Sequence, residues 1–197
     1  MGCAAFSTLQ MASCFRDFGK WLGGRIGPHY AAVRLNRHLD FFLRIEGEWL
    51  RIPEYGKLLA RFGAEGLRCA RLPMQWMAEA GHVAVDAAAR EANSETRRID
   101  ALCAGTGDGT PERAIIDGYR KALEASMADG KTTLRSIRLA LSPTAALLLA
   151  GRGIGQVPPG QAALDAYLAK SPGQRAAVSG FTCHLRDAHK ELFPIQK

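Results

Sequence analysis

Apolar residues recur every three or four positions along almost the whole chain, whereas the strict alternation of a β-strand is absent. One such stripe lies in the segment 30–49 and consists of Val33, Leu35, Leu39, Phe42, Ile45 and Trp49. Proline is well tolerated in the first turn of a helix, so Pro53 and Pro73 predict the starts of two shorter helices. A longer helix is expected from about residue 83 to residue 102. The pattern predicts an all-α fold.

The strongest interruption of this pattern is the segment GTGDGTPER, residues 105–113. Gly105, Gly107 and Gly109 are typical of turns, because glycine is costly inside a helix. Thr110 and Pro111 then have the form of a helix N-cap followed by proline at the first helical position. The segment predicts a boundary between an N-terminal helical region, residues 1–105, and a second helical domain, residues 110–193.

The second half is expected to form four amphipathic helices joined by short turns. The first follows Pro111, and the second begins at Thr132 or Thr133 and is kinked or broken near Pro143. The third is QAALDAYLAK, and the fourth follows SPGQ, which has the form of a capping box. Apolar stripes run along the second helix (Leu134, Ile137, Leu141, Ala145, Leu148) and the fourth (Ala177, Phe181, Leu185, Leu192). Four such helices can bury one core as a bundle or as crossed hairpins.

Charge narrows the range of partners. The chain has 197 residues and carries 26 Lys and Arg against 19 Asp and Glu, which gives a net charge of +7. This balance favours an anionic partner, nucleic acid first and then an acidic protein or a membrane surface. Solubility alone also explains a basic sequence, so the arrangement of the charges has to decide.

The five cysteines are an odd number, are scattered and never form a C-x-x-C pair. This spacing argues against a disulfide framework and against a zinc finger, and it fits a reducing cytosol. The N-terminus lacks the basic region of a signal peptide, and no window of about 18 apolar residues occurs. We therefore expect a cytoplasmic protein that does not insert into a membrane.

No motif in the sequence specifies a catalytic or cofactor site. The segment GRGIG at residues 151–155 lacks the spacing of a dinucleotide fingerprint, and the Gly-Lys-Thr at 130–132 lacks the upstream glycine of a phosphate-binding loop. Cys183 and His184 are adjacent and so point to different faces of a helix. A nucleophile motif such as G-x-S-x-G is missing. We assign no catalytic residue, no metal site and no cofactor.

One basic segment differs from the rest, because no acid occurs between Asp129 and Asp165. Lys131, Arg135 and Arg138 are three or four residues apart and are expected on one exposed side of a helix. Arginine can hold a phosphate with two parallel hydrogen bonds, and a helix start offers free backbone amides to an anion. A solvated face is the alternative explanation, but such a face normally mixes both signs. The predicted DNA-binding residues are Lys131, Thr133, Arg135, Arg138, Arg152, expected in a glycine loop, and Arg175, expected just after a helix start.

The second half also resembles the core-binding, SAM-like N-terminal domain of tyrosine recombinases, the phage-type integrases. The resemblance rests on TTLRSIRLALSPTAALLL and LDAYLAKSPGQRAAVSGFTCHLR and covers about residues 110–190. In that family one helix begins with Ser or Thr and Arg, as at Thr133 and Arg135. A later helix pair carries an apolar pattern that is matched here by Leu164, Tyr167, Leu168, Phe181 and Leu185. The segments LNRHLDFFLRIEGEW and LPMQWM resemble an extra N-terminal segment of some integrases.

The resemblance implies DNA binding but not catalysis. Family catalysis uses an Arg, a Lys, a His-x-x-Arg pair and a nucleophilic Tyr in a separate C-terminal domain, whereas HLRDAH is not His-x-x-Arg and Tyr167 falls in a core stripe. The expected function is to clamp double-stranded DNA through phosphates, either as part of a longer recombinase or as a stand-alone protein. A homo-oligomer or a recombinase is a possible partner. Neutralising about five phosphates predicts a slope of log affinity against log salt of about −4 to −5.

Two other functions remain open. A helical adaptor or inhibitor of an acidic protein would expose an apolar patch, and the residues expected in it are Trp21, Trp49, Trp76 and Met77. An enzyme with a site assembled from distant residues would show a pocket lined by carboxylates or histidines with perturbed pKa values.

Overall fold

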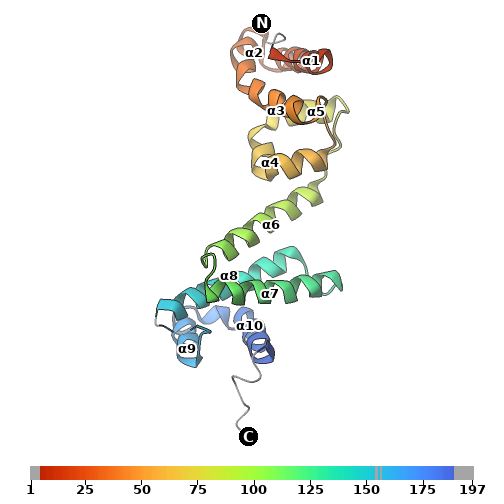
Figure 1. Ribbon diagram of the computed structural model, residues 1–197. Helices are drawn as coiled ribbons and strands as arrows, with labels where there is room; N and C mark the ends of the chain where they lie inside the picture. The colour runs from red at the N-terminus through yellow and green to blue at the C-terminus, as the bar shows by residue number, and fades with distance from the viewer. Residues whose placement is uncertain (1–4, 154, 156, 189–197) are drawn as a thin grey trace. The chain divides into compact units, whose positions relative to one another are not determined.

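The computed structural model describes residues 5–153, 155 and 157–188, and all regular secondary structure within these ranges is helical (Figure 1). The all-α prediction is confirmed. The chain divides into two compact units, residues 1–94 and 95–197. This division falls inside helix α6 (Ala87–Ala104), before the glycine-rich turn that the sequence pattern marks as a boundary.

Between residue 9 and the start of α6, the first unit is built from α1 (Leu9–Ile26), α2 (Pro28–Leu35), the short 3-10 helix η2 (Asn36–His38), α3 (Leu39–Trp49), α4 (Tyr55–Cys69) and α5 (Arg71–Glu79). Gly27 has φ +86°, which only glycine adopts readily, and it lets Pro28 begin α2 directly after α1 ends. The continuous stripe expected over residues 30–49 is interrupted at η2. Val33 is therefore out of phase with α3 and is 63% exposed, whereas Phe42 and Ile45 are buried.

Aromatic side chains fill the core of this unit. The rings of Phe15, Phe18 and Phe42 lie with centroids 5.2–6.4 Å apart, and the Trp76 ring lies 5.8 Å from both Phe18 and Phe42. Trp76 and Met77 are buried, and Trp21 and Trp49 pack against the same core. The exposed patch that the adaptor alternative requires is therefore not formed, because two of these side chains are buried in the core and the other two pack against it.

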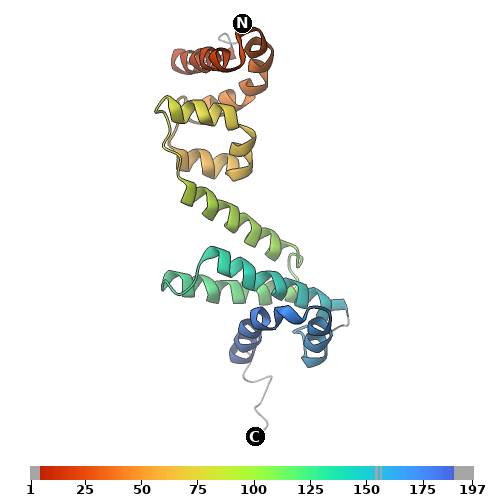
Figure 2. The same cartoon turned by 180° about the vertical axis from the view of Figure 1, so that it is seen from behind.

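The second unit combines the C-terminal part of α6 with α7 (Pro111–Ala128), α8 (Leu134–Gly153), α9 (Gln161–Lys170), η3 (Pro172–Gln174) and α10 (Arg175–Ala188). The helix α8 contacts α7, α9 and α10, and it lies beside α7 in both views (Figures 1 and 2). The core of the second unit contains Ile99 and Cys103 of α6 together with Ile116, Tyr119, Ile137, Leu141, Ala145, Leu147, Leu148, Val178, Phe181 and Leu185. The core thus extends beyond the four helices that the sequence pattern predicts.

The predicted helix starts hold in part. The Thr110 hydroxyl accepts a hydrogen bond from the Arg113 amide at 3.2 Å, and the Thr133 hydroxyl accepts one from Ser136 at 3.2 Å, so both threonines cap helices. Pro143 does not break α8, which continues through it. The capping box at Ser171 is not formed, because the 3-10 turn η3 takes its place. Leu192, predicted in the last apolar stripe, lies outside the described residues.

Candidate nucleic-acid interface

The six residues predicted to bind DNA lie on three parts of the second unit: the start of α8, the end of α8 and the start of α10. Lys131 precedes α8, and its ammonium lies 2.9 Å from a carboxylate oxygen of Asp129. Both side chains are well exposed, so water screens this pair and a phosphate can replace the carboxylate at little cost. Thr133 serves as the cap of α8, and its hydroxyl also lies 3.0 Å from that of Ser136.

Arg138 is held inside the protein. Its Nε donates to Glu95 at 2.6 Å, and Arg98 donates to the other oxygen of the same carboxylate at 2.7 Å. The hydrogen bond from Arg138 is the largest influence on the pKa of Glu95 and, together with Arg98, lowers it against the opposing effect of burial. The Glu95 side chain is 7% exposed and that of Arg138 26% exposed. A phosphate would have to displace a buried counter-ion to bind Arg138.

Arg152 also has an internal partner, although a more distant one. The sequence pattern placed it in a glycine loop, but the helix extends to Gly153 and Arg152 lies in the last turn of α8. Its Nε is 3.6 Å from the carboxylate of Glu112, which is buried, while the Arg152 side chain itself is 56% exposed. A cation in the last turn of a helix is also stabilised by the helix dipole. Arg152 can therefore reach solvent without leaving a favourable position.

Arg135 and Arg175 are the two predicted basic contacts that have no carboxylate partner among the described residues. Arg135 lies in the first turn of α8 and Arg175 begins α10, and neither first turn contains an acid. Both side chains are exposed, and neither forms an ion pair with a carboxylate of the described residues. A helix start carries partial positive charge, which normally attracts acidic side chains. Each of these two turns therefore presents a cation without a described counter-ion. The Arg175 amide donates to the carbonyl of Pro172 in η3, and the Ser136 amide donates to the Thr133 cap, so neither of these amides is free.

The exposed face of α8 between its two basic ends carries no charge. From residue 139 to residue 151 the sequence LALSPTAALLLAG contains no ionisable side chain. Leu139 and Leu149 are 53% and 43% exposed, and Ser142 and Ala146 are exposed between them. Phosphate contacts of this helix are accordingly confined to its two ends.

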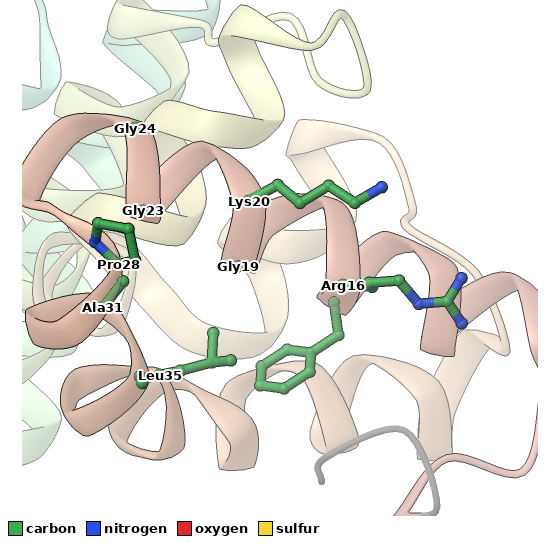
Figure 3. A pocket seen from close by; sticks show the side chains of 10 residues that line it. Arg16, Gly19, Lys20, Gly23, Gly24, Pro28, Ala31 and Leu35 are labelled. Carbon is green, nitrogen blue, oxygen red and sulfur yellow. The ribbon is translucent and has the colours of Figure 1, made fainter.

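The first unit has an open groove between α1 and α2 with a volume of about 630 Å³ (Figure 3). Its lining is apolar apart from Arg16 and Lys20, and it includes neither a carboxylate nor a histidine. Such a lining does not fit the acid–base site that the enzyme alternative requires. Among the described residues, moreover, His, Cys, Asp and Glu do not gather in a group of three that could hold a metal ion.

Comparisons with family models, curated proteins and solved structures gave no match to this chain. The resemblance to recombinase core-binding domains therefore rests on the sequence segments alone. In the part of the chain that the structure describes, no helix has the length and apolar character needed to cross a membrane.

Sequence reasoning missed the acids that partner the basic residues. Glu95 lies four residues before Ile99 and eight before Cys103, so it falls on the core face of α6. A carboxylate that falls on the core face of a helix needs a buried partner. This position was the feature of the sequence that could have indicated an ion pair at Glu95. The periodicity of α6 does not say that the partner is Arg138, 43 residues further along the chain.

Proposed function

We propose that the second unit binds double-stranded DNA through phosphate contacts, as a relative of the SAM-like core-binding domains of tyrosine recombinases, and that it has no catalytic activity of its own. The observation that supports this most is the pair of helix starts at Arg135 and Arg175, each with an exposed guanidinium and no acid. A phosphate offers several acceptor oxygens to each of these guanidinium groups, and the partial positive charge at the start of α8 adds to the attraction at Arg135.

The phosphate contacts fall into two classes. Arg135 and Arg175 form the first class, because they can bind phosphate without releasing a described counter-ion. Lys131 and Arg152 add to them, since their pairs with acids are exposed or long. Arg138 stays with Glu95 and supports the fold rather than the contact. About four phosphates are then neutralised instead of five, which predicts a log–log salt slope near −3.6.

The uncharged middle of α8 fits the same arrangement. Arg135 and Arg152 are separated by about 25 Å along the helix axis, at 1.5 Å per residue. A helix of this length spans a major groove about 12 Å wide, so its two ends can reach phosphates on opposite strands. The exposed Leu139, Ser142 and Ala146 would then face the groove, where small and apolar side chains permit close approach.

The test is a fluorescence anisotropy titration of a labelled duplex of about 20 base pairs at low salt. Arg135→Glu combined with Arg175→Glu is expected to weaken binding about a hundredfold, since each lost charge-assisted bond contributes about 1.5 kcal/mol or more. An acid in a first helical turn is favourable, so the variant should remain folded. The matched control is Arg34→Glu with Arg37→Glu, which makes the same charge change on exposed residues of the first unit.

The proposal predicts that the control retains affinity to within a few-fold. Equal losses in both variants would reduce the effect to net charge, and an unchanged affinity in the Arg135 and Arg175 variant would exclude this surface. Circular dichroism of both proteins establishes that the helices are intact.

A further inference from the structure

Three glycines of α1 line the groove between α1 and α2: Gly19, Gly23 and Gly24. A Cβ atom added to Gly19 would lie 3.4 Å from the Leu35 side chain, and one added to Gly23 would lie 4.0 Å from the Cβ of Ala31. Both distances are ordinary van der Waals contacts, so a Cβ at either position would fit between the helices, and glycine leaves that space in the groove. Gly24 follows Gly23 on α1, and a Cβ added to Gly24 would meet nothing within 4 Å. The groove is therefore open beside this residue.

The walls of the groove have the spacing of helix-packing ridges. On α1 the wall is formed by Arg16, Lys20 and Gly24, which are four residues apart, and on α2 by Pro28, Ala32 and Leu35. Rows at this spacing are the ones into which the side chains of another helix fit. The groove is open to solvent along its length instead of enclosing a cavity, which suits a helix better than a small molecule.

The two charged side chains that line the groove, Arg16 and Lys20, are both basic. Figure 3 shows the charged ends of Arg16 and Lys20 extending toward the same end of the groove, away from the apolar side chains of Pro28 and Ala31. Lys20 is paired with Asp17 at 3.0 Å, and both side chains are exposed. Arg16 forms no ion pair with a described carboxylate, and no acid lines the groove. An incoming segment with acids on one flank would complement this wall.

We propose that this groove binds an amphipathic helix of a partner protein, whose small apolar residues pack against Gly24 and Ala32 and whose acids, four residues apart, pair with Arg16 and Lys20. A second copy of this chain is a poorer occupant, because the chain carries a net charge of +7. The inference concerns the first unit only and does not depend on DNA binding by the second.

The test uses a fluorescein-labelled synthetic helical peptide of about four turns, with Ala and Leu on one face and Glu at positions i and i+4 on one flank. Its control peptide carries Lys in place of both Glu residues. Anisotropy titrations are run with the full-length protein and three variants: Arg16→Glu with Lys20→Glu, Gly24→Leu, and Arg34→Glu with Arg37→Glu. The last makes the same charge change on side chains that do not line the groove.

The expected result is that the acidic peptide binds and the basic peptide does not, with affinity at least about tenfold lower in the Arg16 and Lys20 variant. Gly24→Leu places a larger side chain in the groove and should abolish binding while keeping the thermal stability of the protein, because leucine is the better helix former and its Cβ atom has nothing within 4 Å. Duplex DNA binding should be unchanged in Gly24→Leu, which separates this inference from the proposed function.

Three results would overturn the proposal. One is that the acidic and basic peptides bind equally well, or that neither peptide binds. Another is an equal loss in the Arg34 and Arg37 control, which would reduce the effect to net charge. The third is a concentration-dependent dimer in analytical ultracentrifugation that Gly24→Leu dissociates, which would assign the groove to a second copy of the chain.

Discussion

Replacing Glu95 by glutamine separates the role of Arg138 in the fold from any role in DNA binding. The carboxylate of Glu95 is buried and accepts from Arg98 at 2.7 Å and from Arg138 at 2.6 Å. Glutamine has a similar shape, but it carries no charge and can accept through only one of its two terminal atoms. The substitution therefore removes one acceptor and turns two charge-assisted hydrogen bonds into at most one with a neutral acceptor.

The size of the effect follows from burial. A hydrogen bond with a charged partner contributes about 1.5–3 kcal/mol. The Arg98 side chain is 62% exposed and recovers hydration, whereas Arg138 is 26% exposed and recovers less. We expect a loss of about 2 kcal/mol in the free energy of unfolding, which lowers the Tm of a unit of about 100 residues by about 8–16 °C. Thermal and urea denaturation followed by circular dichroism measure both quantities.

The same substitution, which lowers stability, should strengthen DNA binding. Freeing Arg138 adds one cation to the proposed interface, so duplex affinity should rise and the log–log salt slope should steepen by about 0.9. Lower stability with unchanged DNA affinity would show that Arg138 does not face the nucleic acid. Unchanged stability would refute the assignment of Glu95 as the buried counter-ion.

The effect on stability also depends on pH. The folded-state pKa of Glu95 is lowered, mainly by Arg138. Its contribution is therefore complete above the ordinary glutamate value of about 4.3 and declines as the pH falls through the folded value. The stability difference between the protein and its Glu95→Gln variant should shrink toward zero in acid. A difference that stays constant from neutral pH to strong acid would contradict this origin.

Other substitutions test separate parts of the account; thermal denaturation measures their stability, and the duplex titration measures affinity for DNA. Asp129→Asn frees an exposed lysine, so it should change stability by less than about 0.5 kcal/mol while raising duplex affinity; a large loss of stability would contradict this. Glu46→Gln keeps one oxygen for the amide and hydroxyl of Thr8 but removes the second oxygen, which accepts from the Ser7 amide, at a cost of about 1–2 kcal/mol that vanishes in acid. Gly63→Ala should cost about 2 kcal/mol, because Gly63 has φ +68° and ψ 168°. Gly118→Ala, in an exposed helical position with open space around it, should gain about 0.5–1 kcal/mol, and a loss there would refute this description of α7.

Local patterns in the sequence were sufficient to predict most of the helices. Helical periodicity identified the buried faces around Phe42 and Ile45 and around Ile137 and Leu141, because each face depends only on residues a few positions apart. Proline at helix starts and the threonine caps were also local. The break at residues 36–38 was not foreseen, since no proline or glycine marks it.

The electrostatics of the candidate site needed the tertiary structure. Spacing along one helix predicted that Arg135 and Arg138 share an exposed side, but it did not show that Glu95 on α6 pairs with Arg138 and leaves only Arg135 exposed and without a carboxylate partner among the described residues. The same holds for Arg152, whose partner Glu112 comes from the start of α7. Ion pairs between helices depend on how the helices pack, and no periodicity within one helix encodes that. The groove between α1 and α2 likewise depends on how these two helices pack, which no pattern within one helix reveals.

The central claim is that exposed cations of the second unit bind a phosphate backbone, and salt dependence tests it most directly. The affinity of the unmodified protein for a duplex of about 20 base pairs should be measured from about 50 to 200 mM salt. We predict a linear log–log plot with a slope near −3.6, corresponding to about four neutralised phosphates. Absence of binding at the lowest salt concentration, or a slope near zero, would contradict the claim.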